Sequence, residues 1–454
     1  MSAAELAERA LEAAPAGGDA LAHAEAERSL MLRFARSRPT QSTAVSDASV
    51  EVAVVREGHV GRASTNAADD EALAACGARA AAAADAAARA GGPGPFPGFG
   101  PSPAPRSHEG HDRETARLDP ATGAAALEVA FAAAADRGVE AHGVWTAGEV
   151  DRAVATSAGR TVSERVADAF MKVVCIGPTG RSGYASAAAV AVADIAPAAL
   201  AGRAAALAAV EDEPAELPPG EYPVVLEAAA VGELLELLGR CAFNGRLHAE
   251  GQGALVGRLG TRVAAPAINL SDSPRFPSTL PRGFDAEGVA KAPLPLIEDG
   301  VAHAVVHDMA SGALAGERST GHASAPGGES FGPVPSNLVL VGGGAADVAE
   351  LAAPVERGIY VTRLWYGNVV RADEALVTAV TRDGTFLIED GEIVRPAADM
   401  RLTDDALSVL AGVQALAARA ELVSDGELYG RRFARGSVCP AIRSGAVRFS
   451  GRVG

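Results

Sequence analysis

The chain has 454 residues, which exceeds the size at which a single hydrophobic core stops growing, so two domains are expected. It carries 57 acidic against 40 basic residues and a formal net charge of −17, which argues against a nucleic-acid-binding or polybasic membrane surface. Four scattered cysteines without a CxxC pair, the lack of a signal-peptide pattern and the lack of an apolar run of about 18 residues predict a cytoplasmic protein with reduced thiols.

Helix and strand patterns alternate over the first half of the chain. The first sixteen residues have helical spacing, and residues 27–38 and 45–65 alternate apolar with polar side chains around an Arg-Glu-Gly turn. This alternation predicts an antiparallel meander. Helices are predicted over residues 69–90, 120–137 and 196–210, and alternating strands over 140–160 and 170–189. The expected structure of this part is an antiparallel sheet with flanking helices.

Two stretches rich in proline interrupt these patterns. Residues 91–105, GGPGPFPGFGPSPAP, are predicted to be a long surface loop, because proline lacks a hydrogen-bond donor and glycine loses much backbone entropy in a helix or strand. The acidic residues 211–223 suit a domain boundary. We therefore predict an N-terminal α+β domain, residues 1–212, and a C-terminal β-rich domain, residues 220–454.

The C-terminal part combines strands with one amphipathic helix. Residues 222–228 have the composition of a buried strand, and residues 231–243 have the apolar spacing of a helix. Residues 293–309 and 378–396 place Asp-Gly pairs between alternating runs, which predicts hairpins. The fold class expected for the whole chain is α+β, with a barrel-like C-terminal domain that also contains helices.

His303 and His307 raise the possibility of a metal site. On a helix, two histidines four residues apart lie one above the other and suit one zinc ion. These two follow the Asp299-Gly300 turn within an alternating run, so a strand is predicted instead. Four strand residues span about 13 Å, which is too far for two imidazoles to share one ion.

Four further patterns have an ordinary structural explanation beside the functional one. His108 and His111 resemble half of a metal site, but they lie in the Pro/Gly-rich region, and exposure is expected. His248 with Glu250 could act in acid–base catalysis, a pairing that chance also produces. The glycines at 342–344 lack the spacing of a phosphate-binding loop. Cys439 could be a nucleophile only beside a base, and a buried thiol is the simpler expectation.

Several motifs, taken in order, resemble the TldD/PmbA family, modulators of DNA gyrase that act as cytoplasmic peptidases. The N-terminal motifs are LRFARSRPTQST, GHVGRASTN, VATSAGR and GRSGY. The C-terminal motifs are LGTRVAAPAINLSDSP, GFDAEGVAKAPLPLIEDGV, STGHA and ARGSVCPAI. The resemblance covers nearly the whole chain, but the loop at residues 91–105 matches no family motif.

The resemblance also implies which type of subunit this is. The TldD type carries HExxxH on the first helix of the C-terminal domain and a later cysteine that completes a zinc site. Here Gly232 and Leu237 fall where the histidines would be, Glu233 alone remains, and Arg435 takes the place of the cysteine. A zinc-activated water needs three protein ligands. The chain therefore resembles the PmbA (TldE) type, with no metal, cofactor or catalytic residue of its own and zinc expected in a TldD-like HExxxH partner subunit.

By this analogy the pair is a metallopeptidase hetero-oligomer that cleaves extended or unfolded peptide. The resemblance suggests nine positions that line the peptide or an interface: Arg33, Gln41, Ser64, Thr65, Asn66, Ser319, Thr320, Gly321 and His322. Their alternative role is to form turns and caps. Two other functions stay open: a subunit of a related metal-dependent hydrolase in modified-peptide biosynthesis, and a peptide-binding protein that acts alone.

Overall fold

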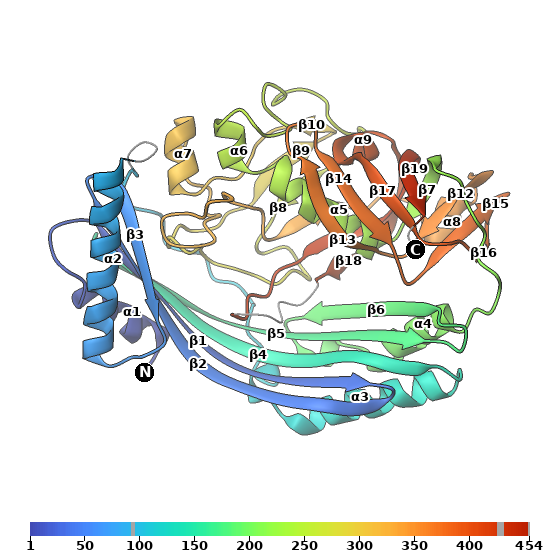
Figure 1. Cartoon of the computed structure of the whole chain (residues 1–454), viewed down its shortest axis with the longest axis horizontal. Coiled ribbons are helices and arrows are strands. Elements are labelled where there is room, and N and C mark those ends of the chain that lie inside the picture. Colours follow the sequence, from blue (N-terminus) through green and yellow to red (C-terminus); the bar gives the residue numbers. More distant parts are fainter. Residues whose placement is uncertain (92–95, 425–430, 453–454) are drawn as a thin grey trace.

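The computed structural model describes residues 1–91, 96–424 and 431–452, and it is an α+β structure built on two sheets (Figure 1). Within the described residues, the first sheet has six antiparallel strands in the order β3-β2-β1-β4-β5-β6. They are β1 (Ala20–Ala35), β2 (Arg38–Arg56), β3 (His59–Thr65), β4 (Glu140–Thr156), β5 (Arg160–Ile176) and β6 (Ser182–Ala189). The predicted meander is confirmed as β1-β2-β3.

Four helices cover one face of the first sheet. They are α1 (Ala3–Glu12), α2 (Asp70–Ala90), α3 (Pro120–Ala135) and α4 (Pro197–Ala208), and short 3-10 turns at Thr115–Arg117 and Val192–Asp194 precede α3 and α4. Each starts where the sequence supplies a cap or a proline; Asp69, for example, accepts a hydrogen bond from the amide of Ala72. The first pair packs at one end of the sheet and the second pair at the other (Figure 1).

Strand alternation assigns the two faces of the first sheet to different neighbours. On β1, Ala22, Ala24 and Leu30 pack with the helices. Leu21, directly before Ala22, is buried on the opposite face against Phe284 of the C-terminal region. Because successive strand residues point to opposite faces, this second face also carries His23, Glu25 and Glu27 toward the C-terminal region. The sheet is therefore covered on both sides, with a polar stripe along one of them.

Among the described residues, thirteen strands form the second sheet, which is mostly antiparallel and does not close into a barrel. They are β7 (Gly220–Leu226), β8 (Leu270–Asp272), β9 (Leu294–Glu298), β10 (Val301–Ala302), β11 (Leu338–Leu340), β12 (Arg357–Val361), β13 (Leu364–Arg371), β14 (Leu376–Thr381), β15 (Thr385–Glu389), β16 (Glu392–Pro396), β17 (Met400–Asp405), β18 (Val413–Val423) and β19 (Ser437–Arg452). The long β19 pairs with β7, β11, β17 and β18 and thereby ties the sheet together.

Helix α5 (Ala228–Cys241) is the buried helix of the C-terminal region. It corresponds to the predicted amphipathic helix, and its leucines lie in the largest core cluster. The other helices of this region are short: α6 (Gly245–Ala249), α7 (Met309–Ala315), α8 (Val348–Ala352) and α9 (Ala406–Ala411). Residues 209–219 connect α4 to β7, and we keep the domain limits 1–212 and 220–454 as a proposal.

The predicted hairpins are confirmed at two of three Asp-Gly turns. Asp299 (φ 48°) with Gly300 joins β9 to β10, and Asp390 (φ 48°) with Gly391 joins β15 to β16. Positive φ at both turn residues matches the twist of the flanking strands. The turn at Asp383 is not a hairpin, because β14 pairs with β13 and β17 while β15 pairs with β12 and β16.

Two local predictions were wrong. Strand β10 ends at Ala302, so His303 and His307 do not lie on one strand; His307 is buried beside the Asp308 cap of α7.

The loop over residues 91–105 is not wholly at the surface within its described part, residues 91 and 96–105. Phe99 is 4% exposed and packs between Val154 of the first sheet and Phe284 of the C-terminal region. Burial of its apolar ring is favourable enough to hold this part of the Gly/Pro-rich loop in the interior.

None of the helices in the described residues is long and apolar enough to cross a membrane.

Candidate functional site

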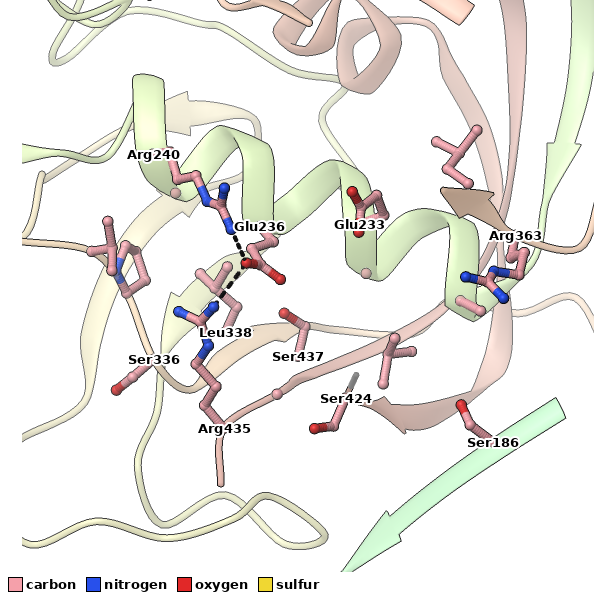
Figure 2. Close-up of a pocket in the computed structure, with 18 of the residues that line it drawn as sticks. Ser186, Glu233, Glu236, Arg240, Ser336, Leu338, Arg363, Ser424, Arg435 and Ser437 are labelled. Carbon is pink, nitrogen blue, oxygen red and sulfur yellow. Dashed lines mark hydrogen bonds and ion pairs between the residues drawn. The ribbon is translucent and has the colours of Figure 1, made fainter. Parts of the chain in front are cut away.

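A cavity of about 260 Å³ lies against one side of helix α5 and is called here the α5 cavity (Figure 2). The residues that line it are Tyr184, Ser186, Ala229, Gly232, Glu233, Glu236, Gly239, Arg240, Val334, Pro335, Ser336, Leu338, Arg363, Leu364, Val423, Ser424, Arg435, Gly436 and Ser437. The polar ones are two carboxylates, three guanidinium groups, four serines and a tyrosine. Such a lining fits a polar or peptide ligand.

On helix α5, the two positions at which the resemblance places the histidines of the TldD type are closed to a metal ligand. A Cβ atom on Gly232 would lie 2.7 Å from Cγ1 of Val423, so no side chain fits there without displacing β18. Leu237 is 2% exposed and belongs to the core instead of the cavity. The described residues also contain no group of three or more His, Cys, Asp or Glu side chains arranged to hold a metal ion.

The two α5 carboxylates are engaged by N–H donors. Glu233 accepts a hydrogen bond from the amide of Gly367 at 3.1 Å. Glu236 accepts one from Nη2 of Arg435 at 3.0 Å and another from Arg240 (Figure 2). An arginine with a carboxylate thus stands where the resemblance placed a cysteine ligand. This donor set does not fit a zinc ion, which takes deprotonated sulfur, nitrogen or oxygen ligands in tetrahedral array.

The first sheet closes the other side of the α5 cavity. The guanidinium carbon of Arg363 lies 3.8 Å from the centre of the Tyr184 ring, and its Nη1 is 3.0 Å from Asp383. Tyr184 in turn donates to Ser186 at 2.9 Å. Stacking and ion pairing together fix the guanidinium plane. The cavity is therefore bounded by both sheets.

A second cavity, of about 320 Å³, lies between the polar face of β1 and the C-terminal region and is called here the interface cavity. It shares Val334, Ser336 and Arg435 with the α5 cavity, so the two cavities are neighbours. Among the predicted site residues, it is lined by Gly321 and His322. The resemblance therefore pointed to one wall of this cavity.

His322 belongs to a fully buried ionic cluster. Its Nε2 lies 3.1 Å from Oδ1 of Asp272, and Lys291 lies 3.4 Å from the same oxygen. Burial works to raise the pKa of Asp272, but Lys291 and His322 outweigh it and hold that pKa far below its ordinary value. Burial lowers the pKa of His322, which keeps the imidazole neutral. One carboxylate thus holds one lysine inside the protein.

The other residues of the Ser319–His322 motif shape this cluster. Thr320 accepts from the amide of His307 at 2.7 Å and is 2.9 Å from Nδ1 of His322. Ser319 donates to the carbonyl of His307 at 3.2 Å. Gly321 has φ 81°, and its carbonyl accepts a hydrogen bond from Nζ of Lys291 at 3.1 Å. The motif joins the α7 cap to the interface cavity.

The N-terminal candidate residues are not brought together. Arg33 pairs with Gln41 across β1 and β2, whereas Ser64 is level with His23, ten strand positions from Arg33. At about 3.3 Å per residue this separates the two groups by roughly 33 Å. The carbonyl of Ser64 accepts a hydrogen bond from Arg79, and the hydroxyl of Thr65 accepts one from the amide of Ala67. Asn66 follows β3 and is exposed. A lining or interface role for these five residues stays a prediction.

The side-chain patterns set aside at the sequence level find structural partners. The His108 side chain is only 8% exposed, contrary to the expected exposure, and its Nε2 lies 2.8 Å from Oε2 of Glu164. His111 pairs in the same way with Glu149 at 2.7 Å. Glu250 pairs with Arg246 instead of His248. Burial raises the pKa of the Cys439 thiol, which donates to the carbonyl of Ala228. A thiol so placed is a poor nucleophile.

Arg432 is the residue that sequence reasoning missed. It reaches from the C-terminal region onto the first sheet, where Nε and Nη2 each donate to the Asp168 carboxylate at 2.7 Å. Nη1 donates to Thr146 at 3.0 Å, and the backbone amide donates to Glu27 at 3.0 Å. A Cβ atom on Gly148 would lie 2.3 Å from Nε, so this glycine makes room for the guanidinium. The signal in the sequence was the charged alternate face of β1.

The fold and the two neighbouring cavities define a two-sheet α+β protein with a polar, ligand-sized site between its halves. Two family models match the chain: the PmbA/TldA metallopeptidase C-terminal domain over residues 219–451, and domain 1 of the same family over residues 24–84. The first match alone exceeds half of the chain, and the chain belongs to the TldD/PmbA family.

Individual relatives agree with this assignment. A metalloprotease of Methanothermobacter thermautotrophicus is 27% identical over 197 residues, which are 43% of this chain and 42% of the relative. A metalloprotease TldD homolog of Haemophilus influenzae is 26% identical over 45% of this chain and 42% of its own length. The matches thus span about two-fifths of these relatives. In structure, TldE from Thermococcus kodakarensis superposes with a TM-score of 0.82 at 19% identity, covering 98% of this chain and 99% of that one.

Proposed function

We propose that this chain is the subunit without zinc of a heteromeric metallopeptidase, of the TldE kind, which binds extended or unfolded peptide for cleavage by a TldD-like partner. Membership of the family and the likeness of the fold to TldE support the pairing. The four cysteines are buried free thiols, which agrees with a complex that acts in the cytoplasm.

The observation that carries the proposal is the wall of the α5 cavity. Gly232 is pressed against Val423, Leu237 is turned into the core, and Arg435 is paired with Glu236. With these side chains, helix α5 retains the cavity but supplies neither imidazole nor thiolate. We therefore assign zinc to the partner, where it would supply a water of lowered pKa for peptide hydrolysis.

In this arrangement the chain contributes binding and orientation. The α5 cavity and the interface cavity share Val334, Ser336 and Arg435 in their walls, and we propose that an extended peptide lies along both. Guanidinium groups and serine hydroxyls along the way can hydrogen-bond to peptide carbonyls without reference to side-chain identity. Such contacts hold substrate equally before and during reaction, so they govern apparent affinity more than turnover.

Assembly is the first expected result. Co-expressed with a TldD-like HExxxH protein, the chain should co-elute with it from a size-exclusion column as a single stable species at micromolar concentration. A permanent interface should bury well over about 1,000 Å². The chain expressed alone and mixed with an unrelated zinc peptidase is the control. Elution of the two co-expressed proteins as separate species would contradict the proposal.

A further inference from the structure

The interface cavity contains more positive than negative charge. It is lined by His23, Glu25, Glu51, Arg152, Arg282, Phe284, Asp285, Ala286, Lys291, Gly321, His322, Ala323, Ser324, Phe331, Val334, Ser336, Arg431, Phe433 and Arg435. Among these described residues, five arginine or lysine side chains face three carboxyl groups. The excess grows as the pH falls through about 6, because burial raises the pKa of Asp285 to about 6 and this carboxyl then becomes neutral.

Arg282 is the most exceptional of these cations. It is 3% exposed, and its Nη2 donates to the carbonyl of Ala434 at 3.0 Å. Its Nε and Nη1 have no hydrogen-bond acceptor among the described residues. Its guanidinium carbon lies 4.7 Å from the centre of the Phe433 ring, which offers no lone pair. Leaving donors of a charged group unsatisfied in the interior costs several kcal/mol, roughly.

Arg152 adds a second undersatisfied guanidinium. It is also 3% exposed, and its Nε has no hydrogen-bond acceptor in the described part of the chain. The carboxylates of Glu164 and Glu25 are 3.5 and 4.0 Å from it, beyond hydrogen-bond length. The other oxygen of Glu164, Oε2, accepts from Gly283 at 2.6 Å and from His108 at 2.8 Å, while the Oε1 that faces Arg152 forms no hydrogen bond with the described residues. Burial, and after it the charge of Arg152, lower the pKa of Arg282.

The remaining walls of the interface cavity are aromatic and aliphatic. Phe284, Phe331, Phe433 and Val334 line it, and Phe331 is 57% exposed at its edge. A volume of about 320 Å³ lies at the small end of ligand pockets and can hold one or two amino-acid residues. Two guanidinium groups with open donors, next to aromatic surface, form the recognition chemistry of a carboxylate attached to an apolar group.

We propose that the interface cavity binds the C-terminal carboxylate of a peptide, with Arg282 as its principal donor and the last side chain among the phenylalanines. This inference rests on the proposed function, because it names the class of substrate that such a subunit would hold: peptides with a free C-terminus and an apolar last residue. A free inorganic oxyanion shares the carboxylate chemistry but would leave the aromatic walls unused.

Calorimetric titration of the full chain, without any partner, tests the proposal. The probes are N-acetyl-Ala-Leu-Phe as the free acid, the same peptide as its C-terminal amide, and inorganic phosphate. The acid should bind at least about tenfold more tightly than the amide, since a charged hydrogen-bonded group contributes about 1.5–3 kcal/mol. Phosphate should bind more weakly than the acid and compete with it.

Three variants and a matched control locate the site. Arg282→Gln should abolish the preference for the acid over the amide. Arg431→Gln removes a cation whose side chain is 43% exposed, so this variant should fold without disturbing the buried cluster. It should reduce the affinity for the acid about threefold to tenfold. Phe331→Ala should weaken both peptides equally. Arg371→Gln, a surface arginine on β13 paired with Glu374, should change neither.

The outcomes that overturn the inference differ from the outcome that overturns the proposed function. Equal affinity for acid and amide, or no binding of either, excludes recognition of the terminus, while assembly with a TldD-like partner would still stand. Phosphate that binds as tightly as the acid identifies an inorganic anion site. Preserved binding with lost assembly would leave the cavity assignment intact and remove the proposed function instead.

Discussion

Replacing Arg432 with alanine is expected to destabilise the protein by about 3–5 kcal/mol, because it leaves the buried Asp168 carboxylate without the guanidinium that it pairs with. Both Arg432 and Asp168 are less than 10% exposed, so water cannot replace the lost donors. The loss should be seen in urea unfolding as a lower midpoint, and as separate unfolding of the two halves of the chain. Arg432→Lys should recover only part of it, since a point charge cannot form the two parallel bonds.

Arg371→Ala is the matched control for this loss. Arg371 is also an ion-paired arginine, with Asp373 at 3.2 Å, but its side chain is 54% exposed, and pairs of this kind contribute about 1 kcal/mol or less. If Arg432→Ala costs no more than Arg371→Ala, then Arg432 does not hold the two sheets together.

Asp272→Asn should have a comparable effect through a different imbalance. It leaves Lys291 charged and buried beside the neutral His322, which predicts a loss of about 3–5 kcal/mol near pH 7. In the wild type the pKa of Asp272 is lowered on folding, so its contribution is present above its ordinary pKa of 3.8 and is lost as pH falls below it. The difference between wild type and variant should therefore shrink in acid.

A double-mutant cycle with Lys291→Met isolates this interaction. Removing both charges should cost less than the sum of the single changes, because no uncompensated charge is left inside. Urea midpoints measured from pH 3 to pH 8 give all four corners of the cycle. Additive losses, or a variant difference that does not change with pH, would show that Asp272 and Lys291 are not coupled.

The sequence patterns that repeat locally predicted the elements of the fold. Strand alternation with a period of two located β1 to β5, and acidic residues marked the start of α2. Local signals failed where tertiary pairing decides. The Asp383-Gly384 turn looks like the other two, yet it connects strands that pair elsewhere, and that choice depends on β12 and β17.

The site was predictable only in part, for the same reason. The resemblance indicated the α5 positions and the Ser319–His322 motif, but the cavities depend on contacts across hundreds of residues. Arg432 meets Glu27, and Arg152 stacks on Phe284 at 4.8 Å. A charged alternate face on β1 indicates a solvated surface unless something covers it. What covers it is encoded far along the chain.

The steric reason for Gly232 was likewise invisible in the sequence. A glycine in the middle of an amphipathic helix is ordinarily a defect that costs about 1 kcal/mol relative to alanine. Here Val423 of β18 occupies the space that a side chain would need. The room that helix α5 has for a side chain at position 232 thus depends on a residue 191 positions further along the chain (423 − 232).

Zinc content, measured together with peptide hydrolysis, tests the central claim most directly. The chain purified alone, the TldD-like partner alone and their complex should each be assayed by elemental analysis and with an unfolded peptide. The account predicts no stoichiometric zinc and no hydrolysis for this chain alone, and zinc-dependent cleavage by the complex that a chelator abolishes. About one zinc per chain in the isolated protein, or hydrolysis by it that Glu233→Gln removes, would contradict the account.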